Sequence, residues 1–201
     1  MHPGPPVWAG VDVGGSRKGF HVALLDAAGS VTLERAATVD ACVALVRAAA
    51  VVGIDAPAAW ADPGERSRAC ERAFTAARVC GIRPTPDEAA AAGRTDRYYE
   101  WIERGLALWA ALRDAGVPAV ECFPTASWTR WVGPRGRTGR GAWSRAGVEA
   151  LGLAGARPAN QDERDAVAAA VTAWQCDRRP ASVERFGDLV VPLAGLPARA
   201  R

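Results

Sequence analysis

The chain has 201 residues, of which 49% are hydrophobic and 23% are charged, and its formal net charge is +3. This length suits one domain with a buried core, and so small a net charge does not by itself indicate a nucleic-acid partner. The five cysteines form no Cys-x-x-Cys pair and the two histidines lie apart from them, which argues against a zinc site. Scattered thiols fit a cytoplasmic location, and no apolar run approaches the roughly 20 residues that span a bilayer.

The first part of the chain predicts an antiparallel meander. Residues 1–6 are expected to form a disordered leader, and residues 7–201 a single domain. Three runs rich in β-forming residues follow the leader, at 7–13, 19–25 and 30–36, and glycine-containing turns separate them. Short turns between consecutive strands favour antiparallel pairing.

Helices and strands then alternate along the chain. The expected elements are a helix at 39–50, a strand at 51–55, a helical segment at 63–79, a loop at 80–93, a helix at 96–116, a strand at 117–123, a Gly-, Arg- and Trp-rich segment at 127–143 and a helix at 160–176. No element is assigned to the apolar run at 188–196. Strands joined through helices pair in parallel with right-handed connections. The expected fold class is therefore α/β, with a mixed sheet of three antiparallel strands followed by parallel strands, and helices on both faces.

Carboxylates occur on three of the predicted strands and on the last helix. Asp12 lies within the first strand, Asp55 ends the fourth, and Glu121 lies near the end of the fifth. Asp162 and Asp165 share one face of the last helix. A buried carboxylate is costly unless it is paired or binds a cation, and ligands of open α/β sheets bind at the carboxyl ends of parallel strands. We therefore expect the acids to converge on Mg²⁺ or Mn²⁺, which oxygen ligands favour.

Each acid also has an ordinary structural interpretation. Asp12 and Asp55 can be turn acids, and Glu121 can pair with a nearby arginine. Asp162 lies in a first helical turn, where acids are favoured in any case. Asp165 is harder to explain in this way because it begins the apolar face of its helix.

Five motifs occur in a fixed order between about Trp8 and Gln175: "GVDVGGSRKGF", "VVGIDAP", "ERSRACER", "ECFPTASW" and "DERDAVAAAVTAW". This ordered set resembles domain-of-unknown-function family 429, which is described as predicted nucleases with an RNase H fold. The last motif also resembles the final helix of the Holliday-junction resolvases in the wider RNase H superfamily. In those proteins an Asp-x-x-Asp-Ala pattern supplies metal ligands.

The resemblance implies an RNase H-like fold and a metal-dependent phosphodiesterase that acts on nucleic acid. By this likeness Asp12, Asp55 and Asp165 would hold the metal, and Asp162 and Glu121 would assist them. Water bound to one cation would attack the phosphorus, and a second cation would stabilise the leaving oxygen. The type of nucleic acid and the oligomeric state stay open.

Three basic segments are candidates for contacts with phosphate. Their residues are Ser16, Arg17 and Lys18; Arg66, Arg68 and Arg72; and Arg135, Arg137 and Arg140. Tryptophans interleave the third segment and can stack on bases, namely Trp128, Trp131 and Trp143. The alternative for this segment is a solvated loop whose tryptophans pack on the body of the protein. For the second segment the alternative is ordinary ion pairing along a helix.

Two other functions remain open. The motif "GVDVGGS" resembles the first phosphate loop of actin-like sugar kinases, which implies an ATP-binding phosphotransferase. Such kinases need a second similar domain with its own phosphate loop, and this chain has no second "DxGxT" motif. The other alternative is a non-catalytic RNase H-like module that binds nucleic acid or protein. Five placed acids argue against pure binding of nucleic acid, because they repel phosphate unless a metal is present.

Overall fold

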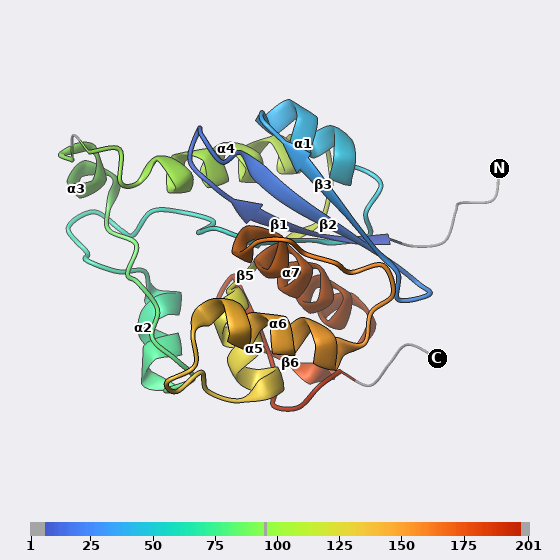
Figure 1. Ribbon diagram of the computed structural model, residues 1–201. Coiled ribbons are helices and arrows are strands. Elements are labelled where there is room, and N and C mark those ends of the chain that lie inside the picture. The colour runs from blue at the N-terminus through green and yellow to red at the C-terminus, as the bar shows by residue number, and fades with distance from the viewer. Residues whose placement is uncertain (1–6, 95, 198–201) are drawn as a thin grey trace.

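The fold is built on a seven-stranded mixed sheet with the strand order β3-β2-β1-β4-β5-β7-β6 (Figure 1). The computed structural model describes residues 7–94 and 96–197, so the leader predicted at 1–6 lies outside the described residues. The strands are β1 (Val7–Val13), β2 (Phe20–Asp26), β3 (Val31–Ala36), β4 (Val52–Asp55), β5 (Ala119–Cys122), β6 (Val183–Phe186) and β7 (Leu189–Pro192).

The pairing of the strands confirms the expected α/β fold with a mixed sheet of three antiparallel strands followed by parallel strands. Strands β1, β2 and β3 form an antiparallel meander, and β4 and β5 continue the sheet in parallel on the other side of β1. The apolar run at 188–196, which received no element, supplies β7, and β7 pairs in parallel with β5. Strand β6 completes a hairpin with β7. All four residues of β7 are buried, as is usual for a short apolar strand in a parallel sheet.

Helices cover both faces of the sheet, as the alternation of elements predicted. They are α1 (Val39–Val46), α2 (Ala69–Ala76), α3 (Glu88–Ala92), α4 (Glu100–Asp114), α5 (Pro124–Val132), α6 (Arg140–Leu151) and α7 (Gln161–Arg178), with a 3₁₀ turn, η1 (Pro180–Ser182). Helices α1 and α4 pack on one face, and α7, backed by α5 and α6, packs on the other (Figure 1). None of the described helices is both long enough and apolar enough to cross a membrane.

Three segments differ from their predicted secondary structure. The loop expected at 80–93 contains the short helix α3, whose first turn is capped by the Asp87 side chain accepting from the N–H of Ala90. The helical segment expected at 63–79 is helical only over α2, because Pro63 and Gly64, whose φ is +83°, hold the preceding chain in a turn. The segment at 127–143 belongs largely to two helices. Pro124 occupies the first turn of α5, where its missing N–H costs nothing, and Gly139 is the N-cap of α6.

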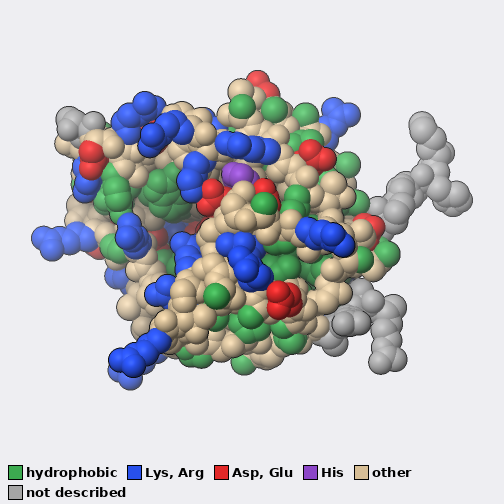
Figure 2. All heavy atoms as spheres, viewed as in Figure 1, with side chains coloured by type: hydrophobic (Ala, Val, Ile, Leu, Met, Phe, Trp, Pro, Cys, Tyr) green, Lys and Arg blue, Asp and Glu red, His purple; other side chains and the backbone are tan. Residues whose placement is uncertain are grey.

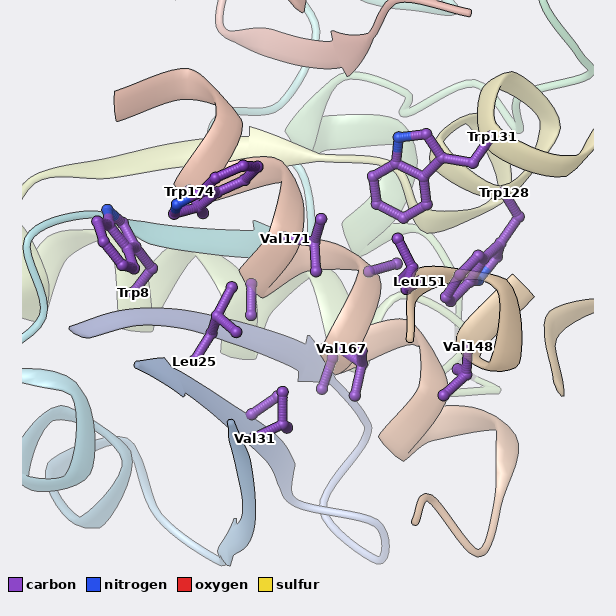
Figure 3. Packing of buried hydrophobic residues seen from close by; sticks show 14 of the residues in the cluster. Trp8, Leu25, Val31, Trp128, Trp131, Val148, Leu151, Val167, Val171 and Trp174 are labelled. Atoms are coloured by element: carbon purple, nitrogen blue, oxygen red, sulfur yellow. The ribbon is translucent and has the colours of Figure 1, made fainter. Parts of the chain in front are cut away.

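The tryptophans of this segment belong to the core and are not available to stack on bases. Trp128, Trp131 and Trp143 are only 1%, 5% and 7% exposed. They pack in one cluster with Trp8 of β1 and Trp174 of α7, on the α7 face of the sheet (Figure 3). The alternative that these side chains pack on the body of the protein is therefore the one observed, since burial of each indole removes a large apolar area from water.

Candidate metal centre

Two neighbouring strands carry the same three-residue pattern in register. Asp12 of β1 pairs with Asp55 of β4, and two residues earlier Gly10 pairs with Gly53. Because side chains alternate along a strand, each Gly and the Asp that follows it two positions later face the same side of the sheet. Both carboxylates therefore lie side by side at one end of the sheet, on the face that α7 covers.

The two glycines let helix α7 lie directly on the sheet. A Cβ atom at Gly10 would stand 2.1 Å from the carbonyl oxygen of Ala166, and one at Gly53 would stand 2.4 Å from that of Ala169. No real Cβ reaches such distances, so only glycine on the strands permits this approach. Helix α7 has alanines along this contact, and Asp165 directly precedes Ala166. The close packing thus carries Asp165 to the two strand carboxylates.

Asp12, Asp55 and Asp165 each contribute a carboxylate oxygen to a group whose members all lie within 4.8 Å of one another. Asp12 and Asp55 are half-buried, and Asp165 is buried. Three hard oxygen donors at this spacing, from three different elements, fit the ligand set of Mg²⁺ or Mn²⁺. The structure therefore brings together the three residues that the sequence singled out as metal ligands.

Without a cation these carboxylates are electrostatically unfavourable. Burial, followed by repulsion from Asp165 and Asp162, raises the pKa of Asp12 well above its usual range. Burial and the neighbouring Asp12 do the same to the pKa of Asp55. Burial also raises the pKa of Asp165, although Arg140 opposes this shift. Crowded, desolvated acids of this kind are a common property of functional sites.

Among the described residues, the side-chain hydrogen bonds to this cluster are all accepted by Asp165. Gln161 Nε2 donates to Asp165 Oδ1 at 2.8 Å and Trp128 Nε1 donates to the same oxygen at 3.2 Å. Arg140 Nη2 donates to Oδ2 at 2.8 Å. Partners that hold a ligand's carboxylate in place are typical of metal sites. Asp55 also lines a pocket that opens beside the cluster.

Asp162 lies beside the cluster and faces two groups from the first hairpin. It accepts from Lys18 Nζ at 2.8 Å, and His21 Nε2 lies 3.8 Å from its Oδ2. It is close enough to Asp12 to raise that residue's pKa. Asp162 is therefore placed to assist the three central carboxylates, one helical turn before Asp165.

Glu121 is not part of the group of three carboxylates and pairs with an arginine. Arg68 Nη1 and Nη2 donate to its two carboxylate oxygens at 2.7 and 2.5 Å, and the backbone N–H of Ala58 donates to it at 2.8 Å. Arg68 also pairs with Glu71, which accepts from the hydroxyl of Thr85. All three charged side chains are buried. The arginine pairing, which was the structural alternative for Glu121, is the arrangement observed.

All the predicted phosphate-binding residues except Arg68 are exposed. Four of the basic ones form ion pairs: Lys18 with Asp162, Arg68 with Glu71 and Glu121, Arg72 with Glu65, and Arg140 with Asp165. Figure 2 shows acidic side chains near the middle of this face with Lys and Arg side chains on several sides of them.

Sequence reasoning missed two features of the site. His21 was considered only as a zinc ligand, yet it stands in register with Asp12 on β2, and burial lowers its pKa while Asp162 opposes this. The role of Gly10 and Gly53 was also missed. The signal that could have revealed it is the repetition of Gly-x-Asp, as "GVD" and "GID", at the ends of two apolar strands.

Comparison with known proteins relates this chain to a protein family and to a solved structure. No curated protein matches the chain. The fold is similar to that of RuvC from Thermus thermophilus, with a TM-score of 0.42 and 14% sequence identity over 93% of this chain and 99% of that chain. The model of the family described as "Protein of unknown function (DUF429)" matches residues 10–186. Because this match covers most of the sequence and agrees with the resemblance carried by the five motifs, the chain belongs to the DUF429 family.

Proposed function

We propose that this protein is a metal-dependent phosphodiesterase that hydrolyses nucleic acid. The observation that carries the proposal is the meeting of Asp12, Asp55 and Asp165 within 4.8 Å at one end of the sheet. These carboxylates repel one another, and they would equally repel a phosphodiester. A cation removes both difficulties, so the same geometry that is unfavourable in the empty protein becomes favourable when metal is bound.

Asp12, Asp55 and Asp165 would hold the first cation, and Asp162 would contribute to a second. Bound divalent cations lower the pKa of a coordinated water and neutralise the charge that develops on the leaving oxygen. Three side chains orient the Asp165 carboxylate by hydrogen bonds, namely those of Gln161, Trp128 and Arg140. Arg140 would also donate hydrogen bonds to a phosphate oxygen of the substrate.

Lys18 is suited to exchange partners when a substrate arrives. Its side chain is 61% exposed, whereas that of Asp162 is 22% exposed. A long, exposed ammonium can leave Asp162 and turn to a phosphate oxygen at little cost, because an exposed ion pair contributes little stability. This exchange would free Asp162 to face a cation. His21 remains beside Asp162 and limits how that carboxylate can turn.

The test is a cleavage assay on a panel of single-stranded, double-stranded, hybrid and branched DNA and RNA. We expect cleavage with Mg²⁺ or Mn²⁺, none with EDTA, and a loss of at least 100-fold in Asp55→Asn. Asp62→Asn is the matched control, since Asp62 is exposed and lies outside the cluster. A protein that binds these nucleic acids but cuts none of them would support the non-catalytic module instead. Binding and turnover of ATP would support the phosphotransferase.

A further inference from the structure

A pocket of about 750 Å³ opens beside the metal centre. Asp55 and Arg140 line it, so the pocket and the carboxylate cluster share a boundary. Its other walls come from the segment at 79–85, the N-terminal turn of α4, and the residues that follow β5. It therefore lies over the carboxyl ends of the parallel strands, where open α/β sheets usually bind ligands.

Part of the pocket lining is apolar and aromatic, and we call this part the aromatic wall. It consists of Pro57, Ile82, Trp101 and Phe123, of which Ile82 and Trp101 are each only partly buried. Ring faces and aliphatic edges at the border of a polar cleft offer contact area to a flat, unstacked base.

The exposed charged side chains at the pocket rim are basic, although Asp55, Glu71 and Glu121 also line the pocket. Arg83 and Arg135 are exposed at the rim, where Arg83 donates to the hydroxyl of Tyr98 at 2.5 Å, and Arg140 lies next to the carboxylate cluster. Arg68 also lines the pocket, but its guanidinium group donates hydrogen bonds to Glu71 and Glu121. We therefore assign Arg68 a structural role and not contact with a ligand. A guanidinium group has five N–H donors, so Arg83 and Arg140 keep donors beyond the ones that bind Tyr98 and Asp165, and such groups recognise phosphate through paired hydrogen bonds.

We propose that this pocket holds one unpaired nucleotide of a nucleic-acid strand, with its base on the aromatic wall and its phosphate at Arg140 beside the carboxylates. The substrate of the proposed nuclease is then single-stranded or locally unpaired nucleic acid. This inference rests on the proposed function for the identity of the strand. The volume lies within the roughly 300–1,000 Å³ of small-ligand sites. A stacked duplex can place a base there only by flipping it out, and a bare phosphate would leave the aromatic wall without a contact.

Gly81 provides a direct way to fill the pocket. It lines the pocket, no atom lies within 4 Å of a Cβ built on it, and its φ is one that other residues adopt. The variants Gly81→Ala, Gly81→Leu and Gly81→Trp therefore form a series of increasing volume without backbone strain. The probe is a nucleoside 5′-monophosphate with Mg²⁺, which contains no phosphodiester to cut, and inorganic phosphate serves as the comparison ligand.

Calorimetric titration should give an affinity for the nucleotide at least tenfold above that for inorganic phosphate. Affinity should fall steadily along the Gly81 series, by at least tenfold in Gly81→Trp, while Mn²⁺ binding shows that this variant keeps a folded metal centre. Arg83→Glu provides a second variant and should also weaken binding. Arg113→Glu at the far end of α4 should not.

Equal affinity for nucleotide and phosphate, or unchanged nucleotide binding in both Gly81→Trp and Arg83→Glu, would overturn the pocket proposal. The same variants then separate the two proposals. If the wild-type protein binds the nucleotide but cuts no substrate, the pocket proposal stands and the nuclease proposal is overturned. If the protein cuts blunt duplex and Gly81→Trp leaves this cleavage unchanged, the nuclease proposal stands and the pocket proposal is overturned.

Discussion

Asp12 is the residue at which stability and function oppose each other most directly. It is half-buried beside two other carboxylates, and burial, followed by repulsion from Asp165 and Asp162, raises its pKa. We predict that Asp12→Asn keeps the fold, because the two side chains are close in shape. Without metal the variant should be more stable by about 1 kcal/mol, which corresponds to roughly 2–4 °C in Tm for a chain of this size.

Bound metal should make the wild-type protein more stable than Asp12→Asn. Mn²⁺ should raise the Tm of the wild-type protein and change that of Asp12→Asn much less, because a ligand and its charge are lost. Thermal melts of both proteins with EDTA and with Mn²⁺ measure the effect. If Asp12 is only a turn residue and binds no metal, the opposite is expected. Asp12→Asn should then lower the free energy of unfolding by about 1 kcal/mol or more through missing hydrogen bonds, and Mn²⁺ should change the Tm of neither protein.

The raised pKa values of Asp12, Asp55 and Asp165 also predict how stability depends on pH. An aspartate in the unfolded chain titrates near about 3.9. Between that value and the raised pKa the folded state binds more protons than the unfolded state, so the free energy of unfolding falls as pH rises through this window. The metal-free cluster is thus most favourable in its protonated form, at the acidic end.

Urea unfolding between about pH 5 and pH 8 measures this dependence, and the difference between wild-type and Asp12→Asn isolates the cluster from other acids. With EDTA we expect the wild-type protein to lose stability relative to the variant as pH rises. Saturating Mg²⁺ should reverse that trend, because a cation replaces the protons and binds more tightly as they leave. The same pH slope with and without Mg²⁺ would show that no cation binds here.

Arg68 and Glu121 form a buried ion pair that lines the same pocket as Asp55. Their side chains are 8% and 4% exposed. Arg68→Met should destabilise the protein by about 3–5 kcal/mol, because it leaves Glu71 and Glu121 buried without a positive partner. Arg72→Met is the matched control, since its pair with Glu65 is exposed, and it should cost less than about 1 kcal/mol. Equal losses in chemical denaturation of the two variants would contradict this account.

At the level of secondary structure, the contact between α7 and strands β1 and β4 controls the metal centre. Gly53→Ala would place a Cβ 2.4 Å from Ala169 O and 2.8 Å from Cys122 Sγ, so the helix must move. Overpacking of this kind costs about 1–3 kcal/mol. We also expect Mn²⁺ affinity to fall by roughly tenfold or more, because displacement of α7 moves Asp165 away from Asp12 and Asp55.

Gly93→Ala is the control for this prediction. A Cβ there would meet only ordinary contacts, the nearest at 3.6 Å, and Gly93 lies at the end of α3, away from α7. Chemical denaturation and Mn²⁺ titration of both variants give the two readouts. Mn²⁺ affinity that survives in Gly53→Ala despite a clear loss of stability would show that the close approach of α7 does not position the ligands.

For the whole molecule, the distribution of charge matters more than its sum. The net charge is only +3, yet exposed arginines such as Arg83 and Arg135 stand at the rim of the pocket beside the metal centre. If this rim contacts phosphates, log K for a single strand should fall linearly with log salt, with a slope of about −0.7 per phosphate contacted.

The double variant Arg135→Glu with Arg137→Glu should weaken binding and make that slope shallower. Arg113→Glu is the control of equal charge change, because Arg113 lies 12 residues after Trp101 on α4, about 18 Å along the helix. Fluorescence anisotropy of a labelled single strand over a range of salt concentrations measures both effects. Binding that ignores salt, or that Arg113→Glu weakens equally, would contradict a localised basic rim.

Local patterns in the sequence were enough for much of this arrangement. Alternating and continuous apolar runs predicted β1 to β5, and helical periodicity predicted α4 and α7, because both patterns depend on near neighbours in the chain. The rule that ligands bind at the carboxyl ends of parallel strands was enough to expect the acids to converge. The resemblance to the DUF429 family was needed to select Asp12, Asp55 and Asp165 from the five candidates.

Other features depended on contacts between residues far apart in the chain, and no local pattern carries those. Glu121 pairs with Arg68, 53 residues away, although several arginines were possible partners. The tryptophans at 128, 131 and 143 face the core only because α5 and α6 stack against α7. The sequence by itself therefore determined which residue types stand at each strand end, whereas the tertiary structure decided which carboxylates cluster and which is neutralised by an arginine, because charge pairing depends on distance in space.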